Sequence, residues 1–324
     1  MRACSEEVMR LGQSSKFKVA TTFAWAAAAL FVAGGARGQS APRQVTPNAD
    51  AGGFASVYGQ VPASQAEFLS TPDSIKNAAA TGAPSLVWEV LEHGEEVECL
   101  DCIPVVAPLL YASDSRTREI AAWWLRRRMF GVFGPGEVYS QTVQTLQTDP
   151  SAVRRADAAY ALGEFLAPSG IPVCATALAS DTDATVRAAA AFALGRMNTD
   201  GNGALGAALT DSDSGVKLAA LHAAARVNTF SGLANVAALL MDPDADVRRN
   251  ALNVLDALDA SDTLAAVTAA AQNDSDATVR AAACHALGTF GSAASSALPV
   301  LQTLETSDPD TFVRDAAQIA IQRI

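Results

Sequence analysis

The sequence predicts an all-α fold, an α–α superhelix (solenoid) of about seven short helix pairs. Alanine dominates the 324 residues and aromatic residues make up only 6 % of them, and alanine is the strongest helix former. An acidic turn followed by an apolar helical pattern recurs every 30 to 37 residues. A further apolar stretch lies between successive copies, so each unit holds two antiparallel helices. One such pair cannot bury both of its apolar faces, and the units must therefore stack.

The recurring pattern is clearest in residues 181–195 (DTDATVRAAAAFALG) and 274–288 (DSDATVRAAACHALG). Each copy can be anchored on a basic residue, and alanine stands three positions after every anchor. At about 100° per residue, the offsets −1, +3, +6 and +7 fall on one helical face. That face is apolar, and its alanine is expected to let a second helix approach closely. The anchors are Arg118, Arg155, Arg187, Lys217, Arg248, Arg280 and Arg314.

Aspartate-rich turns precede these helices, mostly as Asp-Ser-Asp or Asp-Pro-Asp. Their side-chain oxygens can cap the free N–H groups of the helix and complement its dipole. The anchor arginine is expected to pair with a turn aspartate of its own or the neighbouring repeat, which would make a ladder along the stack. Gly163, Gly195 and Gly288 each follow a leucine of the pattern and are predicted to be C-terminal caps.

The motif D-x-D-x-x-V-R-x-x-A-A-x-A-L-G resembles the short HEAT-like repeat, the type first associated with phycobilisome lyases. The resemblance covers roughly residues 76–324 and implies a right-handed α–α superhelix. Some proteins with such repeats are enzymes, and deoxyhypusine hydroxylases bind iron through His-Glu pairs. The three histidines here, His93, His222 and His285, are followed by Gly, Ala and Ala, so no such pair exists. We therefore predict that the chain is not an enzyme and that it holds no cofactor.

Residues 1–38 have the layout of a secretory signal peptide. Lys16 and Lys18 precede the uncharged residues 19–36, and Ala36-Arg37-Gly38 offers small residues for cleavage. The alternative is a retained membrane anchor, although 18 alanine-rich residues are marginal for spanning. We therefore expect an exported protein, periplasmic or extracellular, that meets a membrane only through an uncleaved signal segment. Residues 39–75 are rich in Ala, Ser, Gly and Pro and are predicted to be a flexible linker before the solenoid at 76–324.

The net charge of −11 and a pI near 4.7 limit the possible partners. An acidic chain repels phosphate backbones, which excludes nucleic acid as the expected partner. The predicted function is an exported scaffold that binds a protein or peptide.

Cys99-Leu100-Asp101-Cys102 is the one compact reactive motif, and it stands just before a predicted helix. In an oxidising compartment a local disulfide is the first expectation. A redox-active pair is the alternative, which would make the chain a thiol redox or cofactor-handling protein. A metal site with His93 and Glu96 would leave tetrahedral zinc short of a ligand, so no metal is predicted. Cys174 and Cys284 lie in distant repeats and are expected to be small core residues.

Position +5 after each anchor points about 145° away from the apolar face. It carries aromatic or imidazole side chains in several repeats, and Trp123, Tyr160, Phe192 and His222 are the predicted partner-binding residues. The alternative is that these rings pack on neighbouring repeats or are covered by residues 39–75. The full column is Trp123, Tyr160, Phe192, His222, Asn253, His285 and Ile319.

Two further features allow expectations. Arg126, Arg127 and Arg128 form a local basic spot that is expected to pair internally with Glu89, Glu92, Glu95 and Glu96, which relieves like-charge repulsion. The chain is expected to stop after the first helix of its seventh repeat, without a second helix to cover it. Exposed Ile319 and Ile324 would then favour self-association.

Overall fold

The computed structural model describes residues 70–95, 97–131, 134–198 and 202–324. The described chain is helical except for one short hairpin, in which β1 (Phe130–Gly131) pairs antiparallel with β2 (Gly134–Pro135). The predicted signal segment and most of the predicted linker lie outside the described residues. Within the described ranges, no helix is both long and apolar enough to span a bilayer.

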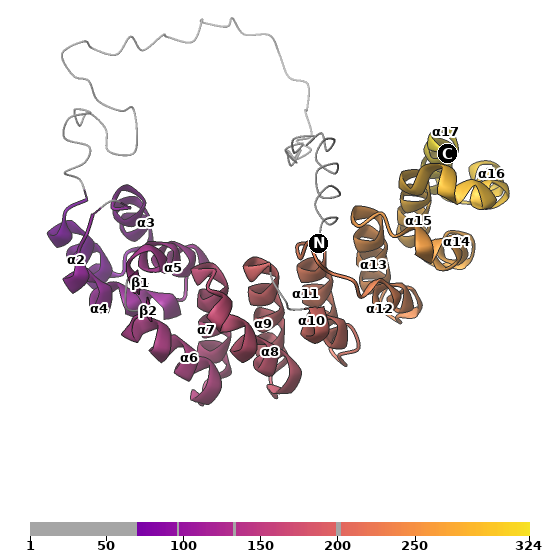
Figure 1. Ribbon diagram of the computed structural model, residues 1–324. Coiled ribbons are helices and arrows are strands. Elements are labelled where there is room, and N and C mark those ends of the chain that lie inside the picture. Colours follow the sequence, from indigo (N-terminus) through magenta and orange to yellow (C-terminus); the bar gives the residue numbers. More distant parts are fainter. Residues whose placement is uncertain (1–69, 96, 132–133, 199–201) are drawn as a thin grey trace, which may run out of the picture. The chain divides into compact units, whose positions relative to one another are not determined.

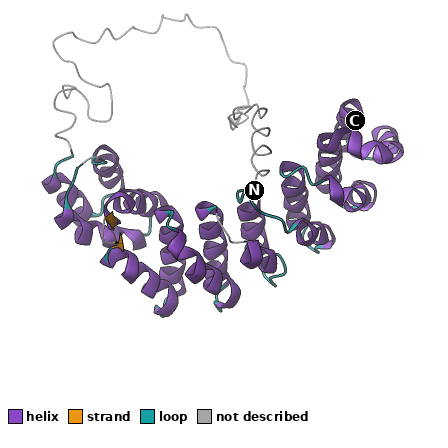
Figure 2. Ribbon diagram, in the orientation of Figure 1, coloured by secondary structure: helices purple, strands orange, loops and turns teal. Residues whose placement is uncertain are grey.

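The helices form two layers, and successive helices of a layer pack side by side (Figures 1 and 2). The layer that carries the repeated motif also holds one preceding helix. Its members are α3 (Pro84–His93), α5 (Ser115–Met129), α7 (Ala152–Phe165), α9 (Ala184–Met197), α11 (Ser214–Ala224), α13 (Ala245–Ala257), α15 (Ala277–Phe290) and α17 (Thr311–Arg323).

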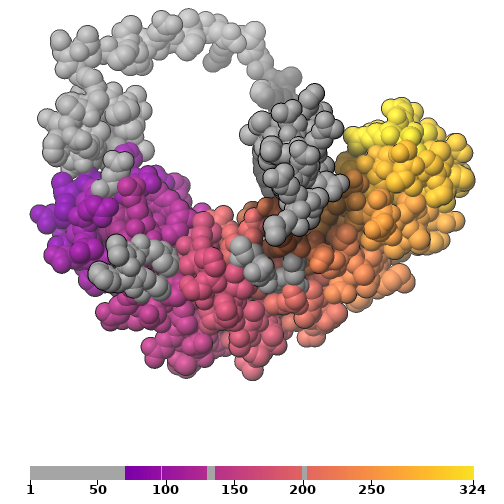
Figure 3. Space-filling model, viewed as in Figure 1, coloured from indigo at the N-terminus to yellow at the C-terminus, as the bar shows by residue number. Residues whose placement is uncertain are grey.

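The second layer holds the shorter helices that come before each motif helix. Its members are α2 (Pro72–Thr81), α4 (Ile103–Val106) with the 3₁₀ helix η3 (Ala107–Tyr111), α6 (Glu137–Thr148), α8 (Ile171–Ser180), α10 (Asn202–Ala208), α12 (Leu233–Ala238) with η5 (Leu239–Met241), α14 (Leu264–Asn273) and α16 (Leu298–Ser307). Further 3₁₀ turns are η2 (Leu100–Cys102), η4 (Pro168–Gly170), η6 (Ser261–Thr263) and η7 (Gly291–Ala297). Colours follow one another in sequence order along the helices (Figure 3), as expected of a solenoid. The predicted all-α solenoid is confirmed.

The motif helix is the second helix of its pair, not the first. Helix α17 packs on α16, its own partner, as well as on α15. The expectation that the chain stops on an uncovered first helix was therefore wrong. Sequence periodicity locates the helices, but it does not show whether a motif helix pairs with the helix before it or with the helix after it.

The expected apolar columns form the core. Every alanine three positions after an anchor is fully buried, as are the valines that precede five of the anchors. The alanines are Ala121, Ala158, Ala190, Ala220, Ala251, Ala283 and Ala317.

We expect Ala190→Leu to lower the free energy of unfolding by roughly 1–3 kcal/mol, because the added carbons must enter a filled contact between motif helices. The measurement is the urea midpoint of the variant beside that of the native chain. Ala257→Leu, at the exposed end of α13, is the matched control and should leave the midpoint unchanged. Equal midpoints for all three proteins would show that the assigned register is wrong.

The glycines that follow the pattern leucine are not helix caps. Gly163, Gly195 and Gly288 lie inside α7, α9 and α15. A Cβ on Gly195 would stand 2.8 Å from the Cα of Ala223 on α11, and a Cβ on Gly163 would stand 2.8 Å from the Cα of Ala193. Neighbouring motif helices thus come so close that only a hydrogen fits, and the predicted capping role was wrong.

The expected ladder of ion pairs is present. Arg187 donates from Nε and Nη2 to both oxygens of Asp211, at 2.7 and 2.9 Å, and from Nη1 to the carbonyl of Asp181 at 2.9 Å. Asp211 also accepts the N–H of Asp213, whose own side chain caps α11. Each step therefore joins two turns and the start of a helix. The other steps are Arg155–Asp181, Lys217–Asp242, Arg248–Asp274 and Arg280–Asp308.

The helical array begins earlier than residue 76. Thr71 and Ser74 form a capping box, with each side chain bonded to the other's backbone, and α2 starts at Pro72. Ile75 is fully buried, and Ser70 Oγ donates to the carbonyl of Val90 at 2.7 Å. The end of the predicted linker at residue 75 was therefore placed too late, since a short capping signal inside a Ser- and Pro-rich stretch resembles linker composition.

Candidate binding cleft

The +5 column lies on the face of the motif helices that points away from the second layer. Most of its side chains are exposed, including Tyr160, Phe192 and His222. Trp123 differs, because it is half-buried and packs against the core. The outward face was predicted correctly, but Trp123 does not stand on it as a free side chain.

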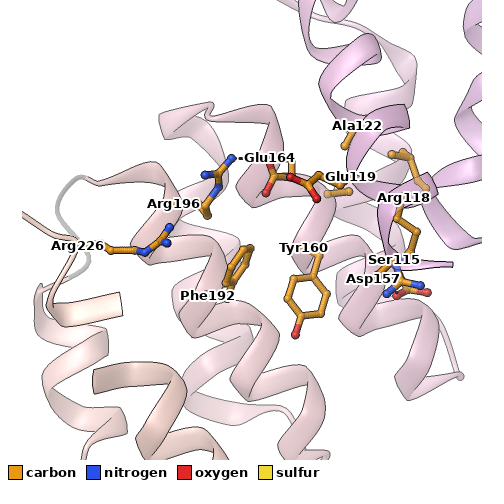
Figure 4. Close-up of a pocket in the computed structure, with 12 residues that line it drawn as sticks. Ser115, Arg118, Glu119, Ala122, Asp157, Tyr160, Glu164, Phe192, Arg196 and Arg226 are labelled. Carbon is orange, nitrogen blue, oxygen red and sulfur yellow. Dashed lines mark hydrogen bonds and ion pairs between the residues drawn. The ribbon is translucent and has the colours of Figure 1, made fainter. Parts of the chain in front are cut away.

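Tyr160 on α7 and Phe192 on α9 form the centre of this face. Their ring centroids are 5.1 Å apart with an edge-on arrangement, and 37 % and 36 % of the two residues remain exposed. The two side chains come from adjacent helices and lie next to each other (Figure 4). An aromatic pair of this kind offers rigid apolar surface with little entropy to lose on binding.

A cleft of about 480 Å³ lies beside this pair and runs across α5, α7 and α9 to the turn that follows α11. Ala122 and Ala161 contribute small side chains, so the cleft is open above them. Charged side chains form its rim (Figure 4): Arg118, Glu119, Asp157, Glu164, Arg196 and Arg226.

Two ion pairs neutralise four of these charges. Arg118 Nε lies 3.1 Å from Asp157 Oδ1, and Arg196 Nη2 lies 2.5 Å from Glu164 Oε2. Asp157 is buried, and that burial raises the pKa of its carboxyl while Arg118 opposes the shift. Arg118 here pairs with a helix residue instead of a turn aspartate, so the ladder departs from its pattern at the cleft. The Nε of Arg196 is buried and has no acceptor among the described residues.

Glu119 on α5 and Arg226, in the turn after α11, are the remaining rim charges. Both are exposed, and neither makes an ion pair with any described residue. No described residue neutralises either of these two charges.

The charged rim was missed in the sequence, although a signal for it exists. Glu119 stands one position after its anchor, and Glu164, Arg196 and Arg226 stand nine positions after theirs. Offsets of +1, +5 and +9 differ by four residues and so share one helical face. Only the aromatic column was followed along that face.

His222 lies on α11 outside the cleft. It is exposed, and its Nε2 lies 3.3 Å from Asn250 Oδ1. The structure thus brings together Tyr160 and Phe192 among the predicted partner-binding residues, and leaves Trp123 and His222 outside the pair.

Cys99 and Cys102 form a disulfide in the structure, between α3 and α4, with Cα atoms 5.3 Å apart. Both residues are buried. Cys174 and Cys284 are buried free thiols, as expected, and burial raises the pKa of each to about 12. Searching the described residues finds no group of three or more His, Cys, Asp or Glu side chains that could hold a metal ion, and Glu96 lies outside them.

The arginines after Trp124 behave differently from one another. Arg127 Nη1 lies 3.5 Å from Glu95 Oε1, in line with the expected internal pairing. Arg128 instead donates to main-chain carbonyls of Gly94, Glu95 and Val97, and it makes no ion pair with a described glutamate.

Comparison with known proteins identifies the repeat. The family model for HEAT repeats matches residues 171–234 and 232–322. A search of curated proteins finds no matching sequence. The likeness to the phycobilisome-lyase type remains a resemblance.

Solved structures with TM-scores above 0.5 share the fold. The X-ray structure of the Escherichia coli protein YibA is 19 % identical, with 81 % of this chain and 95 % of that chain covered and a TM-score of 0.53. Kap121p bound to Nup53p is 16 % identical, with 80 % of this chain but only 33 % of that chain covered and a TM-score of 0.54. Human deoxyhypusine hydroxylase in complex with glycerol is 18 % identical over 80 % of this chain and 96 % of that chain, at a TM-score of 0.34. Identities this low concern the fold alone.

Proposed function

Because this chain carries HEAT repeats, we propose that it is a non-catalytic scaffold that binds a protein or peptide partner in the cleft beside Tyr160 and Phe192. The observation that carries the proposal is the exposed aromatic pair, which is bordered by two charges, Glu119 and Arg226, that no described residue pairs with. Buried aromatic anchors with a polar rim provide most of the energy of protein interfaces. The partner of Kap121p, Nup53p, illustrates that a related fold can hold a protein segment.

The histidines argue for the same class of function. His222 and His285 lie on different helices, α11 and α15. Each lies against one polar side chain, since His222 Nε2 lies 3.3 Å from Asn250 Oδ1 and His285 Nδ1 lies 3.1 Å from Asp256 Oδ2. Among the described residues, neither belongs to a cluster of His, Cys, Asp or Glu side chains that could hold an iron ion.

Alanine at Tyr160 or at Phe192 is expected to weaken partner binding by about 1–4 kcal/mol while the helical fold stays intact, because the core columns are untouched. The partner is captured from the exported fraction on the immobilised native chain, and its affinity is then measured for each variant. Asn253→Ala is the matched control, at the same +5 register but outside the cleft. Variants that melt earlier yet bind the partner normally would show that the rings only cover neighbouring repeats.

Export is part of the proposal and has its own test. Chain isolated from outside the cytoplasm is expected to begin near Gln39, which removes Cys4, and to titrate with two free thiols under denaturing conditions. Those thiols would belong to Cys174 and Cys284, with Cys99 and Cys102 joined. Intact mass and a thiol count on one sample measure both. Four free thiols, or a soluble cytoplasmic chain that retains residues 1–38, would contradict it.

The Cys99–Cys102 disulfide gives little support to the alternative of a thiol redox or cofactor-handling function. Exchange requires a thiolate to reach a sulfur of the disulfide. Cys99 is 7 % exposed and Cys102 is fully buried, so attack on this disulfide would first need the loop to open.

A further inference from the structure

The two ends of the cleft carry opposite charge. Once the two ion pairs of the rim are set aside, Glu119 remains at the α5 end and Arg226 remains at the other end, in the turn after α11. The exposed edges of Tyr160 and Phe192 lie on the two helices between them (Figure 4). The surface therefore presents an acid, an apolar centre and a base in that order.

The spacing suits an extended chain. Packed helices lie roughly 8–10 Å apart, so three steps from α5 to α11 span roughly 25–30 Å. An extended peptide covers that span in about eight residues at about 3.3 Å each.

We propose that the cleft binds an extended protein segment with a basic side chain toward Glu119, a large apolar side chain against Tyr160 and Phe192, and an acidic side chain toward Arg226. This inference rests on the proposed function and specifies its partner. Charge complementarity selects such a segment over one with a single sign of charge, because like charges at either end are repelled. Whether the segment runs from α5 to α11 or in reverse is open to the experiment.

The test is a selection from a display library of random peptides about twelve residues long, which is enough to span the cleft. The full chain is compared with Glu119→Lys and with Arg226→Glu. Asp315→Lys and Arg323→Glu are the matched controls, since both residues are exposed on α17 at the same +1 and +9 positions. Phe192→Ala serves to show that enriched peptides occupy the cleft.

The native chain should enrich peptides with opposite charges on either side of an apolar residue. Glu119→Lys should replace the basic flank by an acidic one, and Arg226→Glu should replace the acidic flank by a basic one. A synthetic peptide from the native selection should bind each reversal variant about threefold or more weakly at low salt, and the difference should shrink at high salt. The α17 controls should select and bind as the native chain does.

The other outcomes separate the two proposals. Peptides that need Phe192 but show no charge pattern, or a pattern that the reversals leave unchanged, would overturn this inference and leave the proposed function standing. No enrichment, or enrichment unaffected by Phe192→Ala, would overturn both. Self-association in sedimentation that Phe192→Ala abolishes would identify a second copy of the chain as the occupant and would overturn the peptide assignment.

Discussion

Replacing Asp211 by alanine is expected to lower the free energy of unfolding by about 3 kcal/mol. Asp211 accepts two hydrogen bonds from Arg187 and one from the backbone of Asp213, and only about a tenth of either partner's side chain is exposed. The variant would leave a mostly buried guanidinium without its carboxylate partner, with only main-chain carbonyls of the Asp181 turn as acceptors, and an uncompensated charge costs more than the pair contributes. Urea denaturation of the variant and the native chain measures the effect.

Two further variants show whether the pair is responsible. Arg187→Met in the Asp211→Ala background removes the orphaned charge and should recover a large part of the loss. Asp315→Ala on α17, where the carboxylate is exposed and makes no ion pair with a described residue, should change stability by less than about 0.5 kcal/mol. Equal losses in Asp211→Ala and Asp315→Ala would contradict a structural role for the ladder.

The same pairs determine how stability depends on pH. In three of the ion pairs, hydrogen bonds from the arginine hold the pKa of the aspartate below its ordinary value of 3.8. A carboxyl whose pKa is lowered by folding stabilises the native state above its unfolded pKa, and that stability is lost as the pH falls through the folded value. The array should therefore lose stability below about pH 4, and less steeply in Asp211→Ala. The three pairs are Arg155–Asp181, Arg187–Asp211 and Arg280–Asp308.

Features that repeat along the chain could be predicted, because each copy tests the same local rule. The alanine and valine columns, the turn aspartates and the anchor arginines were all visible as offsets within one helix or between adjacent turns. The sequence even limited the partner of Arg187 to an aspartate in the turn of its own repeat or of the neighbouring repeat. Such contacts are short in sequence or recur at a fixed interval, so periodicity alone specifies them.

Features that depend on how closely helices approach could not be predicted. Gly195 after a leucine resembles a cap, and only the position of Ala223 on the next helix shows that it is a crossing point. Trp123 shares the +5 register with Tyr160 and Phe192, yet it packs against the core near the irregular first repeats. Offsets within one helix indicate the direction in which a side chain points, but they do not show which residues of other helices lie in that direction.

The cleft was half predicted for the same reason. The aromatic column was found because position +5 points away from the apolar face, which made the rings of Tyr160 and Phe192 conspicuous there. The rim residues Glu119 and Arg226 are ordinary surface charges in the sequence. Their significance comes from lacking a partner in the described structure while lying at opposite ends of one cleft, and that depends on four helices at once.

Several main-chain groups around Arg128 depend on its guanidinium for their hydrogen bonds. Its guanidinium stacks 3.6 Å from the ring of Trp124 and donates to the carbonyls of Gly94, Glu95 and Val97, the segment that leads into the disulfide. Burial lowers the pKa of Arg128 to about 10, which still leaves it charged at neutral pH. One cation thus satisfies several backbone acceptors that have no helix or strand to bond them.

We therefore expect Arg128→Met to lower the free energy of unfolding by about 3 kcal/mol, because it keeps much of the packing but removes the donor to the carbonyls of Glu95 and Val97, while Gly94 keeps the N–H groups of Trp124 and Val97. Arg128→Lys should lose somewhat less, since an ammonium keeps the charge but cannot span the same acceptors. The matched control is Arg127→Met, whose exposed side chain meets Glu95 at 3.5 Å and should contribute less than about 1 kcal/mol. Denaturation midpoints measure all three, and amide exchange of residues 97–102 should speed up only in the Arg128 variants. Equal midpoints for Arg128→Met and Arg127→Met would show that the segment before the disulfide is held by other contacts.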